Sequence, residues 1–260
     1  MKIRTLADRM LRGHLDEVGI VCKVIGGRPG TMLDVGAHYG SSSAPFLARG
    51  WSVHAFEPDP VNRAVLSANY PAAKVDPRAI AEFDGARVSL FTSDVSTGIS
   101  ALSPFHPTHA PTATVETVRL DTYIQTNGLD RVDFLKTDVE GHDLAALRTF
   151  PWDSQKPRAV VCEFEDKKTV PLGHEARDIA EFLADKGYAV LVSEWEPIVE
   201  YGSTHRWRRF APFPSEIPAD SWGNLIAVDP ELLDRLNRSA RSAAWKLYFR
   251  RRLGRYFPSN

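Results

Sequence analysis

The chain contains few cysteines and no long apolar run. Its two cysteines, Cys22 and Cys162, are far apart in sequence and form no metal-type pair. Cys162 lies in an apolar segment, where we expect a buried free thiol. No run approaches the length of a membrane span, and the first residues lack the apolar core of a signal peptide. These absences predict a reducing, cytoplasmic setting.

The chain also lacks an excess of either charge. Its formal net charge is −1, so no global electrostatic field favours nucleic acid as a partner. With 260 residues and no repeat or low-complexity linker, it can bury a substantial core. We therefore expect a single domain over residues 1–260. Its expected parts are an N-terminal helix (1–27), a cofactor-binding core (30–195), an acceptor-recognition segment (196–222), and a last strand with a C-terminal amphipathic helix (223–260).

Short apolar strands alternate with helical patterns along most of the sequence. Strands are predicted at 31–35, 51–56, 73–76, 132–137, 158–164, 188–195 and 224–228. Helices are predicted at 3–25, 41–49, 60–69, 121–127, 142–149 and 174–186, and from residue 230 onward. Segments 87–91 and 115–120 alternate in polarity and predict an inserted hairpin around a long loop, 93–111. This order is typical of an α/β protein with a mostly parallel sheet covered on both faces.

Two acidic strand ends are the most informative feature. The first strand ends at Asp34 and leads into a glycine turn, and the second strand ends at Glu57. In nucleotide-binding βαβ units, a carboxylate at about this separation hydrogen-bonds a ribose diol. The pattern predicts an adenosine-containing cofactor bound by Asp34, Gly36, Ala37, His38, Tyr39, Gly40, Ser41, Glu57 and Pro58, with Asp138 from a later strand.

The glycine turn narrows the choice of cofactor. A dinucleotide site requires a middle glycine for close approach to a pyrophosphate, and here His38 occupies that region. No Walker lysine is nearby, which argues against a triphosphate. S-adenosylmethionine (SAM) has a ribose and no phosphate, so it fits better. The alternatives are a nicotinamide-dependent reductase, which is expected to carry a catalytic Tyr-x-x-x-Lys or an equivalent, and a non-catalytic SAM-binding scaffold.

Four segments carry a resemblance to a known family: Leu33–Gly40, Phe56–Asp59, Leu120–Tyr123 and Asp133–Leu144. They resemble the FkbM-type SAM-dependent methyltransferases, over roughly residues 30–195. The resemblance implies the Rossmann-like class I methyltransferase fold, a three-layer sandwich with a seven-stranded, mostly parallel sheet and an antiparallel last strand. It also implies O-methylation of a hydroxyl on a carbohydrate or secondary metabolite. His38 stands where asparagine is frequent in that family, and Asp143 where glutamate is.

The expected catalytic residues follow the fourth and fifth core strands. Asp138 ends an apolar strand, Glu140 follows it, and His142 starts a helix beside it. His142 is the predicted general base because imidazole accepts a proton near neutral pH, with a structural hydrogen bond as the alternative. Asp138 and Glu163 are also candidate ligands for Mg²⁺, which prefers oxygen. Glu140 is alternatively a solvated acid at a helix start.

The carboxyl third interleaves basic and aromatic residues. His205, Arg206, Trp207 and Arg208 are predicted to bind the acceptor, a small molecule or an anionic glycan, although a solvated basic loop has the same composition. Residues 231–255 predict an amphipathic helix rich in arginine and aromatic residues. Such a helix packs on the core or on a partner, including a second copy, or lies peripherally on the inner face of an anionic membrane.

Overall fold

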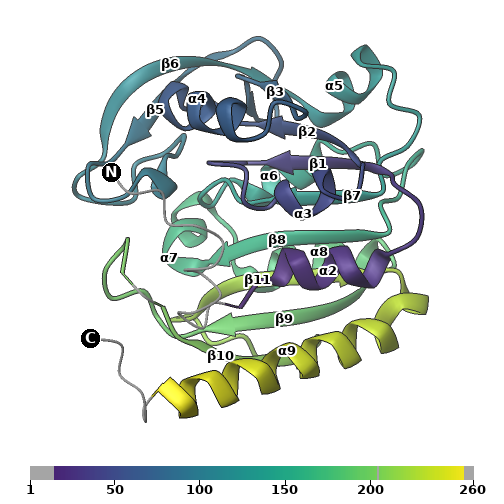
Figure 1. Cartoon of the computed structure of the whole chain (residues 1–260). Coiled ribbons are helices and arrows are strands. Elements are labelled where there is room, and N and C mark those ends of the chain that lie inside the picture. The colour runs from purple at the N-terminus through teal and green to yellow at the C-terminus, as the bar shows by residue number, and fades with distance from the viewer. Residues whose placement is uncertain (1–14, 204, 255–260) are drawn as a thin grey trace.

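The computed structural model describes residues 15–203 and 205–254. Its centre is an eight-stranded sheet with the order β10-β9-β11-β8-β7-β1-β2-β3 (Figure 1). The strands are β1 (Thr31–Val35), β2 (Ser52–Phe56), β3 (Lys74–Asp76), β7 (Phe134–Thr137), β8 (Ala159–Glu165), β9 (Ala189–Trp195), β10 (Trp207–Pro212) and β11 (Trp222–Val228).

Five neighbouring strands of this sheet, β3, β2, β1, β7 and β8, are parallel. β11 lies between β8 and β9 and is antiparallel to both, which confirms the expected antiparallel last strand. Asp34 of β1 pairs in register with Ala55 of β2 and Lys136 of β7. The carboxyl ends of β1, β2, β7 and β8 therefore meet at one edge, where open α/β sheets bind ligands.

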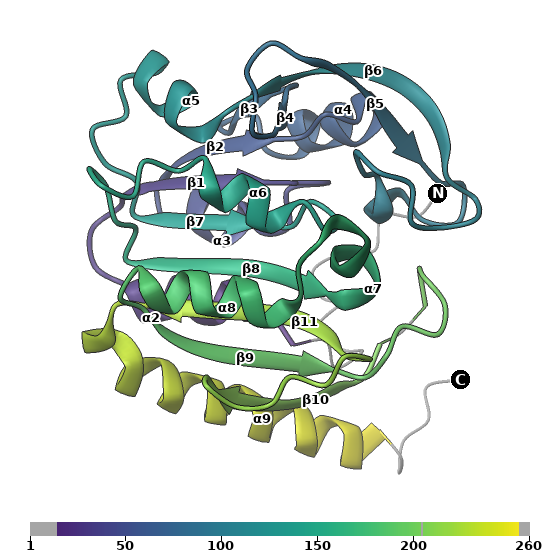
Figure 2. The ribbon, with the colours of Figure 1, turned by 180° about the vertical axis from the view of Figure 1, so that it is seen from behind.

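Helices cover both faces of the sheet (Figures 1 and 2). One face carries α2 (Glu17–Ile25), α3 (Ala44–Leu47), α4 (Pro60–Asn69) and α9 (Leu233–Gly254), and the other carries α5 (Leu120–Thr126), α6 (Asp143–Arg148) and α8 (Ala176–Asp185). In β8, Val160 and Cys162 pack into one apolar layer, and Ala159 and Val161 pack into the other. Burial of alternate residues on two faces explains why the central strands are continuous apolar runs.

A smaller sheet is inserted after β3, with the order β4-β6-β5. β5 (Arg87–Thr92) and β6 (Ala110–Val118) pair antiparallel, which confirms the predicted hairpin. β4 (Ala79–Ile80) adds a short parallel pairing to β6. The long loop between β5 and β6 contains a 3₁₀ turn, Thr97–Ile99, and extends over the carboxyl edge of the main sheet.

The structure corrects three expectations. The sheet has eight strands and not seven, because residues from the expected acceptor segment form β10 at the edge beside β9. The helix expected over 41–49 is only α3, four residues long. Of the helix expected over 3–25, the structure contains α2, while residues 1–14 are outside the described residues. The division of residues 1–260 into one domain with four parts stays a prediction.

The edge strand β10 is attached by ion pairs to a buried acid. Arg208 Nη1 lies 2.5 Å from Glu194 Oε1, and Arg209 Nε lies 2.7 Å from Glu194 Oε2. A strand at the edge of a sheet has one unpaired side, and these contacts to β9 fix its register. Arg208, which was expected to meet an acceptor, therefore holds the sheet edge together with Arg209.

α9 packs along the molecule through an apolar stripe that includes Leu236, Ala240 and Leu247, and it contacts α2. This confirms that part of the C-terminal helix packs on the core. No helix within residues 15–203 and 205–254 is long and apolar enough to cross a bilayer.

Gly36 lets the turn after β1 approach the turn after β7. Its φ is +74°, and a Cβ there would lie 1.9 Å from the backbone oxygen of Asp138. Gly85 also has a positive φ, +68°, but a Cβ there would have no neighbour within 4 Å. A substitution at Gly85 therefore tests backbone strain alone, and a substitution at Gly36 tests the same strain together with a steric collision.

We expect Gly85→Ala to lower the free energy of unfolding by about 1–2 kcal/mol, the cost of a left-handed alanine. Gly36→Ala should cost at least about 2 kcal/mol more, because two loops must separate as well. Urea unfolding monitored by circular dichroism measures both values. Equal losses in the two variants would contradict the close approach at Gly36.

Candidate functional site

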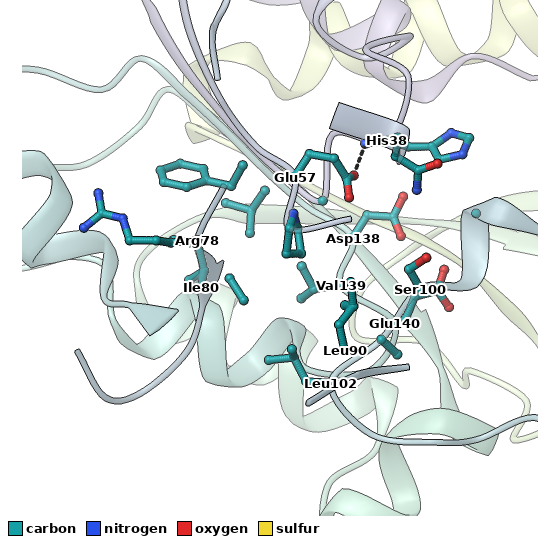
Figure 3. A pocket seen from close by; sticks show the side chains of 18 of the residues that line it. His38, Glu57, Arg78, Ile80, Leu90, Ser100, Leu102, Asp138, Val139 and Glu140 are labelled. Carbon is teal, nitrogen blue, oxygen red and sulfur yellow. Dashed lines mark hydrogen bonds between the residues drawn. The ribbon is translucent and has the colours of Figure 1, made fainter. Parts of the chain in front are cut away.

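The first cavity lies at the carboxyl ends of β1, β2 and β7, under the loop that follows β5 (Figure 3). Apolar side chains form one end, and acidic side chains form the other. Its walls include Val35, Gly36, His38, Phe56, Glu57, Pro58, Asn62, Arg78, Ile80, Leu90, Thr97, Ser100, Leu102, Asp138, Val139 and Glu140. An apolar slot that ends in carboxylates suits a flat ring attached to a polar, cationic group.

Glu57 is held in this cavity by two backbone groups. His38 N donates to Glu57 Oε2 at 2.7 Å, and Asp59 N donates to Oε1 at 2.9 Å. The carboxyl is nearly buried, and burial raises its pKa to about 7 even though the two N–H groups act in the opposite direction. Each oxygen has a further lone pair, so the carboxylate can accept two more hydrogen bonds from a diol.

His38 adopts a left-handed conformation, with φ of 50°. This conformation turns its N–H towards Glu57, as the dashed line in Figure 3 shows. A left-handed backbone at a residue other than glycine costs about 1–3 kcal/mol. Residues that carry this cost are concentrated at binding sites, where the surrounding contacts hold them in place. His38 Nε2 also lies 3.0 Å from Thr97 Oγ1, and Tyr39 Oη lies 3.1 Å from the same oxygen.

The loop that closes the first cavity is fastened at several points. Besides the contacts of Thr97 Oγ1, Asn62 Nδ2 donates to the Thr97 carbonyl at 3.0 Å, and Ser100 Oγ donates to Asp59 Oδ2 at 3.1 Å. The enclosed volume is about 70 Å³, well below the roughly 300–1,000 Å³ of small-molecule sites. The segment 97–102 must therefore shift when a ligand of nucleoside size enters.

Lys136 joins the turns after β1 and β7. Its Nζ donates to the Gly36 carbonyl at 2.6 Å and lies 3.4 Å from Oδ1 of Asp34 and from Oδ2 of Asp138. Burial lowers the pKa of Lys136, but Asp138 and Asp34 outweigh burial, and the pKa is raised. Asp34 also accepts from Ser43 Oγ at 2.6 Å. Asp34 therefore braces the turn from behind and does not face the cavity.

A second buried lysine lies among the acids that follow β7 and β8. Lys168 Nζ, on α7 (Asp166–Thr169), is 2.5 Å from Glu140, 3.2 Å from Glu163 and 2.9 Å from Glu165. Oxygens of Asp138, Glu140 and Glu163 lie within 4.8 Å of one another, a spacing that fits a metal ion. The Lys168 ammonium already supplies a positive charge to this cluster.

Asp138 and Glu163 are a coupled acidic pair with opposite pKa shifts. Burial raises the pKa of Asp138, but Lys136 and Lys168 outweigh burial, so the pKa is lowered. Burial and the charge of Asp138 raise the pKa of Glu163 well above its ordinary value. The charged form is therefore favoured at Asp138, and the protonated form is favoured at Glu163.

The second cavity lies on the other side of Asp138 and is larger, about 530 Å³. Its lining comes from α2, from the ends of β7, β8, β9 and β11, and from α9. The residues include Asp16, Glu17, Lys23, Ser41, Lys136, Asp138, Glu163, Trp195, Trp222, Asn224, Ala243, Lys246 and Leu247. Among residues 15–203 and 205–254, Asp138 is the single one that lines both cavities.

The structure divides the predicted cofactor residues into three groups. Gly36, His38, Glu57, Pro58 and Asp138 line the first cavity, and Ser41 lines the second. The others, Asp34, Ala37, Tyr39 and Gly40, line neither. Gly40 instead allows the turn to approach α4, because a Cβ there would lie 2.5 Å from Leu66 Cδ1.

The expected base and acceptor residues lie outside both cavities. His142 Nε2 is 3.0 Å from Ser103 Oγ, and burial lowers its pKa. Trp207 Nε1 donates to Ser193 Oγ at 3.1 Å, and the His205 ring packs on Trp222. Arg206 Nε lies 3.6 Å from Glu196, and Arg208 pairs with Glu194. Each of these side chains therefore has a partner within the fold.

Two buried lysines beside the cavities were not predicted from the sequence, Lys136 and Lys168. A lysine inside the apolar run that forms β7 was a visible signal, because such a charge is buried only with a partner. Lys168 had no such signal, since it lies in a charged segment typical of solvent exposure.

The topology defines the class of the protein. A parallel sheet extended by an antiparallel strand inserted between β8 and β9, with helices on both faces, is the Rossmann-like class I methyltransferase fold. The sequence matches the family described as "Methyltransferase FkbM domain" over residues 34–190, more than half of the chain. The chain belongs to this family, and its cofactor is SAM.

Solved structures of other methyltransferases are similar at low identity. Magnesium protoporphyrin IX methyltransferase from Synechocystis is 13% identical, with a TM-score of 0.47, covering 88% of this chain and 86% of that one. Precorrin-6y C5,15-methyltransferase from Geobacter metallireducens is 14% identical, with a TM-score of 0.43, covering 87% of this chain and 90% of that one. The O-methyltransferase from Bacillus cereus is 12% identical, with a TM-score of 0.41, covering 82% of this chain and 79% of that one. No curated protein matches the sequence.

Binding of SAM should depend on pH through Glu57. An ionised carboxylate accepts from both ribose hydroxyls, and the pKa of Glu57 is about 7. We expect affinity to rise between about pH 6 and pH 8 and to fall by up to about tenfold per unit on the acidic side. Calorimetry across this range measures the change.

Glu57→Gln is the matched control, because glutamine keeps the shape of the side chain and has no group that titrates in this range. At about pH 8 it should bind SAM more weakly by about 1.5–3 kcal/mol, with a flatter pH profile. Any slope that remains belongs to the ligand or to Glu140, which lines the same cavity and whose pKa burial also raises to about 7. Unchanged affinity in the folded variant would remove the ribose role from Glu57.

Proposed function

We propose that the protein is a SAM-dependent O-methyltransferase that acts on a hydroxyl of a carbohydrate or related metabolite. The observation that carries the proposal is the position of Asp138, whose side chain lines both cavities. A group transferred between two bound molecules must pass where their sites meet, and aligning the reactants there lowers the barrier. An ionised carboxylate at this junction is placed to handle the proton of the acceptor hydroxyl.

The first cavity suits SAM better than a dinucleotide. Its apolar end, formed by residues that include Phe56, Ile80 and Leu102, fits adenine, and Glu57 fits the ribose diol. Asp138 and Glu140 favour a nearby sulfonium and amino group by charge. The one arginine in the lining, Arg78, is paired with Asp76 at 2.7 Å, so it is not placed for a pyrophosphate.

A second observation, the place of the Tyr-x-x-x-Lys spacing, argues against the alternative function of a nicotinamide-dependent reductase. The spacing Tyr-x-x-x-Lys occurs once in the sequence, from Tyr70 to Lys74. Tyr70 packs beside Leu66, Lys74 lies in β3, and neither residue lines the two cavities.

The second cavity suits a polar acceptor. Trp195 and Trp222 offer aromatic surface, and Asn224, Lys23 and Lys246 offer hydrogen bonds and positive charge. Aromatic rings with nearby polar groups suit a sugar, and the two lysines favour one that carries an anionic group. We therefore assign acceptor recognition to this cavity and not to residues 205–208.

SAM supplies the electrophilic methyl group. Asp138 takes the proton of the acceptor hydroxyl as the new oxygen–carbon bond forms and the carbon–sulfur bond breaks. Its low pKa suffices because the acceptor oxygen becomes strongly acidic as it is methylated. Lys136 holds the Asp138 carboxylate in position, with its Nζ 3.4 Å from Asp138 Oδ2. A positioned base of this kind contributes about 10²–10⁴-fold.

The residues around Lys168 fit a bound Mg²⁺ poorly. The ammonium lies 2.5 Å from Glu140 and 3.2 Å from Glu163, so a divalent ion at those carboxylates would face a buried positive charge. We therefore propose that Lys168 takes the electrostatic role that was expected of a metal, and that turnover persists in EDTA.

We expect Asp138→Asn to lower kcat by about 10²-fold or more and to change SAM affinity by a much smaller factor. His142→Ala is the matched comparison, because His142 starts the neighbouring helix but lines neither cavity; its kcat should stay near that of the wild type. Methyl transfer to a panel of sugars, followed with labelled SAM, measures both. Loss of turnover in His142→Ala with full activity in Asp138→Asn would restore the base role to His142. SAM binding without turnover on any acceptor would instead favour the non-catalytic scaffold.

A further inference from the structure

The outer face of α9 carries an exposed aromatic cluster that neither cavity uses. Trp245, Tyr248 and Phe249 are 62%, 54% and 52% exposed. Their ring centroids are 5.6 Å apart for Trp245 and Phe249 and 5.8 Å apart for Tyr248 and Phe249. Large exposed apolar groups that touch one another form a patch, and such patches mark interaction surfaces.

This cluster belongs to a strongly basic helix. The sequence of α9 contains seven basic residues and one acid, although the whole chain is nearly neutral. Arg238 and Arg241 precede Trp245 by seven and four residues, so they share its side of the helix. Both are exposed, and neither has an ion-pair partner among residues 15–203 and 205–254. We call Arg238, Arg241, Trp245, Tyr248 and Phe249 the outer face of α9.

The opposite side of the same helix is the packed one. Leu236, Ala240 and Leu247 are buried against the core, and the helix contacts α2 (Figure 1). The core therefore fixes the orientation of α9 and leaves its outer face available to a partner. A helix held on its domain in this way can bind a flat surface without refolding.

We propose that the outer face of α9 docks on an anionic lipid bilayer. Aromatic side chains suit the boundary between headgroups and acyl chains, and exposed arginines attract anionic headgroups. A second copy of this helix is a poorer partner, because two basic faces repel each other. Mutual packing of the rings makes a continuous apolar surface, which suits a lipid boundary better than the phosphodiester chain of a nucleic acid.

Docking would also orient the second cavity. Ala243, Lys246 and Leu247 of α9 line that cavity, so its wall is continuous with the helix that meets the bilayer. The acceptor would then be met at the membrane surface, a consequence that rests on the proposed function. The docking itself does not depend on that function.

The test is sedimentation of the full chain with two kinds of vesicle, phosphatidylcholine alone and phosphatidylcholine mixed with phosphatidylglycerol. We expect at least about tenfold tighter binding to the anionic vesicles. Trp245→Ala with Tyr248→Ala and Phe249→Ala should weaken that binding by about tenfold or more. Arg238→Glu with Arg241→Glu should abolish the preference for anionic vesicles. Phe83→Ala is the control, because Phe83 is 72% exposed in the loop before β5, outside α9.

Several results would overturn the proposal. They are equal binding to both vesicles, no binding to either, and anionic binding that survives both sets of substitutions. A dimer that dissociates in the aromatic triple variant would assign the face to a second copy, and RNA binding lost in the charge-reversed variant would assign it to nucleic acid.

Thermal unfolding of each variant verifies that it is folded. Methyl transfer to a soluble acceptor without vesicles should be unchanged in the triple variant, so failure of docking and failure of the proposed function are separate outcomes.

Discussion

The buried ammonium of Lys136 connects the two central strands at the edge of the sheet where the two cavities lie. It contacts the Gly36 carbonyl and the carboxylates of Asp34 and Asp138. Asp34 has no exposed surface, so loss of this ammonium would leave a buried negative charge without its partner. Removing one member of a buried pair typically costs about 3–5 kcal/mol. Because the same contact fixes Asp138, the wall between the two cavities depends on it.

Lys168 has the corresponding role for the strand next to β7. Its contacts to Glu140, Glu163 and Glu165 tie the turn after β7 to the end of β8. Glu140 keeps a left-handed backbone, with φ of 57°, and its ion pair with Lys168 offsets the cost of that conformation. The two lysines together allow several carboxylates to lie at one edge, and that edge stays attractive to a cationic cofactor.

The succession of strands and helices along the chain and the inserted hairpin could be predicted from the sequence because period and apolar runs are local signals. The antiparallel last strand was implied only by the resemblance to the FkbM-type methyltransferases. Glu57 could be placed in the site because it ends a strand, and strand ends meet at one edge. The contacts of Asp34, His142 and Arg208 could not be predicted, since each of these residues meets a partner distant in sequence: Lys136, Ser103 and Glu194. The strand β10 could not be predicted either, because an edge strand pairs on one side only and tolerates a polar sequence.

Among the residues that the structure describes, the linings of the two cavities share only Asp138. Under the proposed function, an acceptor in the second cavity would touch none of the loop residues that line the first cavity, and this loop would be free to open. This arrangement permits spent cofactor to be replaced while the acceptor stays bound. On a polymer with several hydroxyls, successive methylations would then follow without release of the chain, and partly modified products would be scarce early in the reaction.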